Sequence, residues 1–353
     1  MAPIEEGYMK LRHGIISSLL ASMLLAPAFA APEPGSKARS GADDVVVDDR
    51  SEQLIKGGLK FLQARQLPNG SWADGERNHT AAITAYVLIG FLSTGNLPGE
   101  GEYGSTVKRG TDFLLDCVRP DGYIAAAEGQ HNMYGHGIAT MALGEIYGMT
   151  GDESVRPKLE RAVKLILGAQ NKEGGWRYNP RPGDADVSVS VLQVVALRVA
   201  KNSGIDVPED NLQRAISYIR SCHHASGGFT YQARGGDAGA ARTAAAVYAL
   251  QVLGLYEDKM VVDGSTYYLN TYQKDKGHFT YGVNYATPTQ YMIGGDKWRT
   301  WYDAMKARLA KDVKTQGATN YWSANGPGGD AYATAVNIGI LAMPYGYLPL
   351  YQR

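Results

Sequence analysis

Acidic side chains gather in a few short segments of this 353-residue chain, and paired carboxylates are its clearest candidates for chemistry. Two carboxyl groups facing each other across a cleft can act as acid and base on a glycosidic bond. The candidates all fall in or near turns that precede apolar segments, namely Asp74, Glu76, Glu128, Asp184, Asp186 and Asp237. Spacing leaves open which of them converge, and acidic loop residues are usually solvated.

Histidine and cysteine offer weaker candidates. The run Cys222-His223-His224 has metal-binding residue types but no spaced second half, so we interpret it as a surface turn. His131 and His136 flank Tyr134 and are candidates for a cavity mouth, although a lone pair of histidines more often belongs to satisfied structure. The sequence predicts no metal site and no cofactor.

An internal repeat reveals the elements that must position these groups. A turn of small residues followed by an aromatic residue recurs about every 50 residues, with aromatic positions Trp72, Tyr123, Trp176, Phe229, Phe279 and Trp322. Each turn follows an amphipathic helical pattern, as in 54–62 and 159–167. In all but the fifth unit, a segment that is apolar or small on nearly all sides follows, as in 80–89 and 187–197. We therefore predict an outer and an inner layer of helices.

The predicted fold is all-α, an (α/α)6 toroid of six helical hairpins with outer and inner rings. The fifth unit is irregular, because its inner segment near 285–293 ends at Gly294-Gly295 and an amphipathic helix follows over 298–314. A short linear solenoid is the alternative, but the terminal units lack the polar outer faces that such arrays need. Cys117 and Cys222 end outer helices of the second and fourth units, so we expect two free thiols.

The turns carry a family resemblance. Gln66-Leu-Pro-Asn-Gly70-Ser-Trp72 and Gln170-Asn-Lys-Glu-Gly174-Gly-Trp176 match the Gln–x3–Gly–x–Trp repeat of squalene–hopene and oxidosqualene cyclases, and Gln273 to Phe279 is a Phe variant of it. From about Leu54 to Pro349 the chain resembles the prenyltransferase/squalene oxidase repeat family of the terpenoid cyclase and protein prenyltransferase superfamily, especially its short, exported single-toroid members. The resemblance implies that glutamine ends an outer helix and that the indole ties neighbouring repeats together.

The same resemblance implies a chemistry for two aspartates. Cyclases protonate an alkene or epoxide with an Asp-x-Asp-Asp motif, and the matching stretch here is Asp184-Ala-Asp186-Val187, in which valine replaces the third aspartate. Asp186 aligns with the acid and Asp184 with its neighbour. The alternative is that Asp186 caps the third inner helix, as Asn78 and Asp330 are predicted to cap others. Whether the protein is an enzyme stays open.

Zinc chemistry does not carry over in the same way. Protein prenyltransferases hold zinc through Asp, Cys and His, and Asp237 matches the aspartate while Gly239 stands where the cysteine belongs.

The residues expected to line the centre of the ring are Asn78, His79, Tyr134, Tyr178, Asp186, Ser188, Tyr231, Arg234, Asp237, Arg242, Tyr285 and Tyr332. Aromatic faces suit apolar ligands, so the leading hypothesis is a toroid that binds an isoprenoid-like small molecule. The alternatives are a non-catalytic cell-envelope scaffold and a glycan-processing toroid enzyme.

The composition and the N-terminal segment indicate where the protein is located and which partners it lacks. Lysine plus arginine equals aspartate plus glutamate, at 35 each, so no net charge favours nucleic acid. Residues 1–30 combine a basic start, a short apolar run and Ala28-Phe29-Ala30, which predicts a signal peptide cleaved near Ala30 and an exported protein, periplasmic or secreted. We expect 31–48 to be a disordered linker, 49–353 to form the toroid, and no segment to span a membrane.

Overall fold

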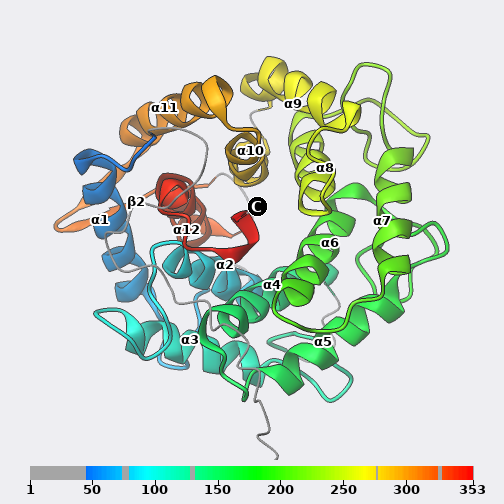
Figure 1. Ribbon diagram of the computed structural model, residues 1–353. Coiled ribbons are helices and arrows are strands. Elements are labelled where there is room, and N and C mark those ends of the chain that lie inside the picture. Colours follow the sequence, from blue (N-terminus) through cyan, green and yellow to red (C-terminus); the bar gives the residue numbers. More distant parts are fainter. Residues whose placement is uncertain (1–44, 74–78, 128–131, 276, 325–327, 353) are drawn as a thin grey trace, which may run out of the picture. The chain divides into compact units, whose positions relative to one another are not determined.

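The computed structural model describes residues 45–73, 79–127, 132–275, 277–324 and 328–352, all of which belong to one compact unit, Ala31–Arg353. Outer and inner helices alternate along the chain within this unit (Figure 1). The outer helices are α1 (Asp49–Arg65), α3 (Gly104–Asp116), α5 (Arg156–Ala169), α7 (Glu209–Ser221), α9 (Lys259–Thr271) and α11 (Gly295–Asp312). The inner helices are α2 (Thr80–Leu92), α4 (Met133–Thr150), α6 (Val187–Asn202), α8 (Ala240–Val252), α10 (Phe279–Ile293) and α12 (Gly329–Ala342).

The inner helices close on themselves. Each contacts the next, from α2 through α4, α6, α8 and α10 to α12, and α12 returns to α2. The first outer helix, α1, also packs against α12 and against the strand β2 (Thr319–Tyr321), which pairs antiparallel with β1 (Lys314–Gln316). The predicted all-α toroid of six hairpins is therefore confirmed, and the linear solenoid is wrong. The small hairpin of β1 and β2 was not expected from the sequence.

Buried tryptophans lock the outer helices α1 and α5 to the turns that follow them. The indole Nε1 of Trp72 donates a hydrogen bond to the Leu62 carbonyl oxygen at 2.6 Å, and Trp176 donates to Ile166 at 2.8 Å. Both rings are fully buried. Gly174, just before the second of these rings, has φ 93°, and a Cβ there would meet a backbone oxygen at 2.2 Å. The turn therefore needs both residues. A side chain at the glycine would clash with the neighbouring backbone, and the buried aromatic ring packs under the turn.

The motif glutamines join neighbouring repeats. The side-chain amide of Gln66 donates to the carbonyl oxygens of Gly70 and Thr106, both at 2.9 Å, so it bridges its own turn and the start of α3. Gln170 makes the same pair of bonds to Gly174 and Asn211 at 2.8 Å. Each glutamine therefore satisfies carbonyl groups on two successive units, which explains its fixed distance from the aromatic residue.

The fifth turn departs from this pattern. Gln273 lies in the 3-10 turn η2 (Tyr272–Lys274), and its amide donates to the hydroxyl of Tyr272 rather than across to the next unit. Phe279 begins α10 and is only half-buried. The prediction that Gln273 to Phe279 forms a Phe variant of the repeat turn is therefore wrong, because the inner helix of this unit starts at the aromatic residue instead of after a loop.

Of the predicted helix caps, one is confirmed and one is wrong. Asp186 is the N-cap of α6, where its Oδ1 accepts a hydrogen bond from the Val189 N–H at 2.9 Å, as predicted. Asp330 is not a cap, since α12 starts one residue before it and Gly328 takes the cap position in a left-handed conformation. Asn78 lies outside the described residues. Cys117 and Cys222 end α3 and α7 as free, buried thiols, which confirms the expectation.

No helix among the described residues combines the length and the apolar character that crossing a membrane requires.

Candidate functional site

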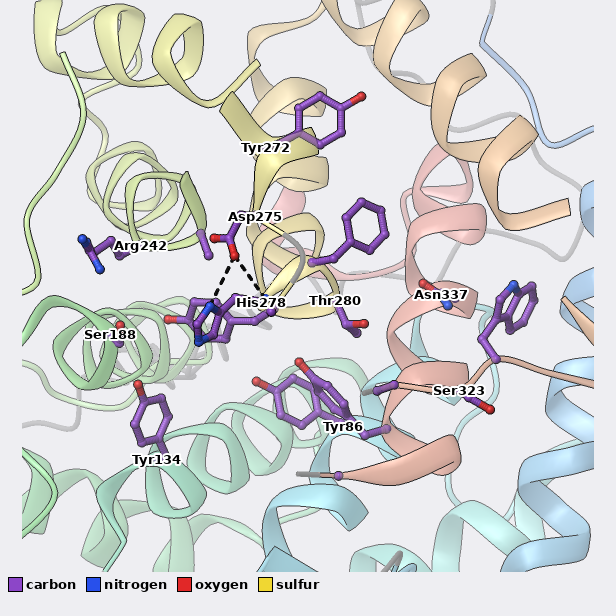
Figure 2. Close-up of a pocket in the computed structure, with 18 of the residues that line it drawn as sticks. Tyr86, Tyr134, Ser188, Arg242, Tyr272, Asp275, His278, Thr280, Ser323 and Asn337 are labelled. Atoms are coloured by element: carbon purple, nitrogen blue, oxygen red, sulfur yellow. Dashed lines mark hydrogen bonds and ion pairs between the residues drawn. The ribbon is translucent and has the colours of Figure 1, made fainter. Parts of the chain in front are cut away.

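A cavity of about 1280 Å³ opens among the N-terminal halves of the inner helices. Every inner helix contributes to its lining, and so do several connecting turns (Figure 2). The most frequent lining side chain is tyrosine, at positions Tyr86, Tyr134, Tyr178, Tyr231, Tyr272, Tyr281 and Tyr332. Among the residues predicted from the sequence, His79, Tyr134, Tyr178, Ser188, Tyr231, Arg242 and Tyr332 lie on this lining.

Four of these tyrosines, Tyr86, Tyr134, Tyr281 and Tyr332, belong to inner helices and form an uncharged surface that we call the tyrosine wall. Burial raises the pKa of Tyr86 to about 12 and also raises the pKa of Tyr134, Tyr281 and Tyr332, so all four hydroxyls stay protonated at ordinary pH. The rings support one another, since Tyr86 meets Tyr332 edge to face with centroids 4.8 Å apart. Such a wall offers broad apolar faces and scattered hydroxyl groups.

Tyr285 does not line this cavity and instead lines a second, smaller one. It lines a second space of about 30 Å³ together with Tyr86, Tyr248 and Tyr351, and it is only 2% exposed. Tyr351 belongs to the 3-10 turn η4 (Pro349–Tyr351), which packs against α4 and α6 and places the C-terminal segment within the ring (Figure 1). The sequence placed Tyr285 in the cavity because it put the start of the fifth inner helix near 285, whereas α10 starts at 279 and Tyr281 takes the lining position.

Arg234 and Asp237 also miss the cavity lining. Both side chains are exposed on the loop before α8, where Gln232 and Gly235 form an isolated antiparallel bridge. This bridge makes a tight turn in which Arg234 takes a left-handed backbone conformation with φ 60°. The turn leaves both residues on the surface, so the expectation that they line the cavity is wrong. Among the described residues, no three His, Cys, Asp or Glu side chains lie close enough to hold a metal ion.

Asp186 and Asp184 stand behind the cavity wall and share one arginine. Asp186 is fully buried, and its Oδ2 lies 3.2 Å from Nη1 of Arg177 while its Oδ1 caps α6. Asp184 lies 3.4 Å from Nε of the same arginine and also accepts a bond from Gln232. Burial raises the pKa of Asp186, although the cap hydrogen bond and Arg177 oppose that rise. Neither aspartate lines the cavity.

Arg177 in turn orders two tyrosines of the lining. Its guanidinium carbon lies 5.1 Å from the ring centroid of Tyr178 and 5.5 Å from that of Tyr231. The two tyrosine hydroxyls are 2.5 Å apart. The chain of contacts therefore runs from the aspartates through Arg177 to the cavity rim. Sequence reasoning missed Arg177, although an arginine directly after Trp176 and close to two aspartates was a usable signal.

The charged side chains along the described part of the lining already have partners. Asp275 Oδ1 lies 3.3 Å from Nδ1 of His278, and Arg308 pairs with Asp312. Arg242 donates to the carbonyl oxygens of Phe229 at 3.3 Å and Asp237 at 2.6 Å. A charged ligand would therefore compete with existing pairs, whereas a neutral ligand would leave them in place.

His136 is a structural residue rather than part of the site. Its Nδ1 accepts a hydrogen bond from the Ile124 N–H at 3.2 Å, and its Nε2 lies 3.2 Å from the Ala162 carbonyl oxygen. In other repeats a hydroxyl accepts the matching N–H, as Thr243 does from Phe229 at 2.8 Å. Complete burial lowers the pKa of His136 to about 4. His131 lies outside the described residues.

Comparison with solved structures places this fold beside two kinds of toroid enzyme. The type II terpene cyclase MstE from Scytonema is 14% identical and aligns over 85% of this chain and 100% of its own, with a TM-score of 0.59. A single-substitution variant of that enzyme has been solved in complex with geranylgeranyl dihydroxybenzoate, its substrate. An inactive variant of the GH76A alpha-1,6-mannanase from Salegentibacter sp., in complex with alpha-1,6-mannotetrose, is 11% identical over the same shares, with a TM-score of 0.63. At these identities the shared feature is the fold.

A family model identifies the chain more directly. The model of the prenyltransferase alpha-alpha toroid domain matches residues 105–284, which run from α3 into α10 and make up just over half of the chain. This segment holds the turns of Trp176 and Phe229, the Asp184 and Asp186 pair, and two residues of the tyrosine wall, Tyr134 and Tyr281. The chain belongs to the prenyltransferase alpha-alpha toroid domain family.

Proposed function

We propose that this protein binds a neutral, largely apolar ligand of the isoprenoid class in its central cavity. The observation that carries the proposal is the wall of uncharged tyrosines, contributed by four different inner helices around one space of about 1280 Å³. Burying apolar ligand surface against such rings is favourable and needs no charged partner. The terpene cyclase with the same fold binds a molecule that carries a geranylgeranyl chain, which is consistent with this ligand class.

We infer that the protein binds its ligand without protonating it through Asp186. An acid that starts cyclisation must reach the reacting carbon, and Asp186 lies outside the cavity lining with both carboxylate oxygens engaged. Val187, where the family motif has a third aspartate, is fully buried at the start of α6. We assign Asp184 and Asp186 the role of holding Arg177, and through it Tyr178 and Tyr231, at the rim of the cavity.

The two alternatives have weaker support. A glycan-processing site needs two carboxyl groups facing the substrate, and the carboxylates on the described lining, Asp275 and Asp312, are each paired with a basic side chain. A scaffold needs no internal space, yet this ring encloses a cavity of about 1280 Å³. The cavity therefore favours ligand binding over both.

Export completes the proposal. We propose that residues 1–30 direct the chain out of the cytoplasm and are removed near Ala30, so that the ring meets its ligand in the periplasm or outside the cell. N-terminal sequencing of the protein recovered from the periplasmic or extracellular fraction tests this directly. A mature chain that starts near Ala31 supports export, and an intact N-terminus in the cytoplasmic fraction contradicts it.

Equilibrium titration with defined probes tests the ligand class. Geranylgeraniol should bind the purified protein, and alpha-1,6-mannotriose should not. Tyr332→Ala removes one ring from the wall and should weaken geranylgeraniol binding at least tenfold. Tyr267→Ala is the control, because this ring lies on α9 and its hydroxyl bonds to the Ala238 carbonyl oxygen outside the cavity. Binding of mannotriose alone, or equal loss in both variants, contradicts the proposal.

A further inference from the structure

The cavity extends between two inner helices, α10 and α12, and reaches the outer helix α11. We call the space between α10 and α12 the seam. Among the described outer helices only α11 contributes to the lining, through Ala304, Met305, Arg308, Leu309 and Asp312. These residues are reached between the inner helices α10 and α12, which pack against each other less closely than the other neighbouring inner pairs. We call this space, lined by Thr280, Ala304, Met305, Leu309, Trp322 and Asn337, the seam chamber.

The irregular fifth turn explains why the inner helices α10 and α12 pack less closely than the other neighbouring inner helices. In regular units a buried aromatic residue of the turn, such as Trp176 or Phe229, fills the space between outer and inner helices. In the fifth unit Phe279 belongs to α10 itself and lies under the guanidinium of Arg308, 4.8 Å from its ring centroid to the guanidinium carbon. No aromatic residue of that turn fills the seam in the described part of the chain, so the central cavity extends into it.

One buried polar side chain lies inside the seam chamber. Asn337, on α12, is 6% exposed and lines the cavity, yet its amide makes no hydrogen bond with another described residue. Figure 2 shows it across the seam from Thr280 of α10. Apart from Thr280, the chamber around Asn337 is apolar, since Met305 and Leu309 are buried and the Trp322 indole already donates to the Leu309 carbonyl oxygen at 2.9 Å. Because this amide faces the cavity, a ligand group or a water can serve as its hydrogen-bond partner there.

The chemistry of this site favours a neutral group. An asparagine amide offers both a donor and an acceptor but no charge. The charged residues nearest the chamber are already paired, Arg308 with Asp312 on α11, and Asp275 with His278 at the start of α10. A hydroxyl or carbonyl oxygen can therefore bind Asn337 without displacing an ion pair, whereas a phosphate or a carboxylate would have to compete with Asp312 for Arg308.

We propose that the seam chamber binds the neutral polar end of the ligand, with the Asn337 amide hydrogen-bonded to its hydroxyl or carbonyl oxygen. The apolar body of the ligand then lies along the tyrosine wall. This inference rests on the proposed function and narrows it from isoprenoid-like molecules in general to those that carry one uncharged oxygen function, such as an isoprenoid alcohol.

Two ligands that differ by one hydroxyl test the proposal. Affinity for geranylgeraniol and for the matching hydrocarbon without the hydroxyl is measured by equilibrium titration, with both ligands delivered from the same cyclodextrin complex. The wild type should bind the alcohol about tenfold more tightly than the hydrocarbon, as expected for one buried hydrogen bond. Asn337→Leu keeps the side-chain size and should erase this preference while leaving hydrocarbon affinity within about twofold.

The controls separate this inference from the proposed function. Asn284→Leu changes an asparagine on α10 that lines the small second cavity instead, and it should keep the preference for the alcohol. If Asn337→Leu does not fold, Ala304→Leu narrows the chamber from α11 and should also remove the preference. Two ligands bound by the wild type with equal affinity, or a preference that survives both variants, overturn the assignment of the seam chamber. Failure of the wild type to bind either ligand overturns the proposed function, and this assignment with it.

Discussion

Arg177 lies 3.2 Å from the buried carboxylate of Asp186 through Nη1 while its guanidinium carbon lies 5.5 Å from the ring centroid of Tyr231. One arginine thus joins the cap of α6 to the rim of the cavity. The two aspartates that resemble the acid motif of cyclases both contact this arginine, and neither lines the cavity.

This arrangement predicts different costs for the two ion pairs. Arg177→Gln leaves the fully buried Asp186 without its countercharge and should lower the free energy of unfolding by about 3 kcal/mol. Asp184→Asn removes a carboxylate that is 56% exposed and should cost less than about 1 kcal/mol. Urea unfolding of both variants measures the difference, and equal costs would contradict the assignment.

Arg177 should also affect ligand binding, independently of its effect on stability, because it holds two tyrosines at the rim of the cavity. Because Tyr178 and Tyr231 stack on its guanidinium, Arg177→Gln should weaken geranylgeraniol binding several-fold even at a temperature where the variant is fully folded. Lys172→Gln, which changes an exposed charge in the same turn, serves as the control. An unchanged affinity in folded Arg177→Gln would show that the rim tyrosines are held without the arginine.

Because His136 is buried, the free energy of unfolding should fall at acidic pH. Its pKa falls to about 4 in the folded protein from 6.5, so below pH 6.5 the unfolded chain binds a proton that the folded protein resists. Stability should therefore drop as pH falls from 6.5 to 4, by about 3 kcal/mol from this group. His136→Thr, which introduces the kind of hydroxyl that other repeats use here, should flatten this part of the pH profile. A wild-type profile that is flat between pH 6.5 and 4, or a variant that keeps the same slope, contradicts the prediction.

Glu145 predicts the opposite step at higher pH. This carboxyl on α4 is buried beside the C-terminal segment, and desolvation raises its pKa to about 8 from 4.5. A raised carboxyl pKa stabilises the fold below the unfolded value, and that stability is lost as pH rises through 8. Melting temperature should therefore fall between pH 5 and 8 in the wild type but not in Glu145→Gln. An identical fall in the variant would assign the effect to other groups.

The repeat turns predict a graded response to aromatic replacement. Trp176→Phe removes the indole bond to the Ile166 carbonyl oxygen but keeps a buried ring, as Phe229 does naturally, and should cost about 1–2 kcal/mol. Trp176→Ala also leaves a large void and should cost about 3–5 kcal/mol. Thermal unfolding of the two variants checks the order, and equal losses would mean that the ring contributes little beyond its hydrogen bond.

The sequence predicted the architecture well because the repeat is local. Glycine, an aromatic residue and a glutamine at fixed distance specify each regular turn, and the helices on either side differ in apolar pattern. First-turn residues of inner helices, such as Tyr134 and Ser188, were placed on the cavity for the same reason. Asp186 was also recognised as a cap from its position before α6.

What the sequence could not supply depends on tertiary packing. Tyr285 was misplaced because one irregular turn shifts the start of α10, and a shift of six residues moves a side chain well over one helical turn along the axis. Arg234 was misplaced because a tight loop carries it to the surface. Asn337 and the residues of α11 went unnoticed, since only the spacing of α10 and α12 exposes them to the cavity.

Ligand binding in the tyrosine-lined cavity is tested by mass spectrometry of molecules extracted from the full-length protein after purification without detergent. We expect a neutral isoprenoid-type molecule in the wild type and its loss in Ala82→Trp, which fills the cavity from α2 and leaves the outer ring unchanged. Val262→Trp, at an exposed position on α9, should retain the molecule. An extract that contains no lipid, or the same lipid in equal amount from the cavity-filling variant, would contradict a ligand-binding role for the tyrosine-lined centre.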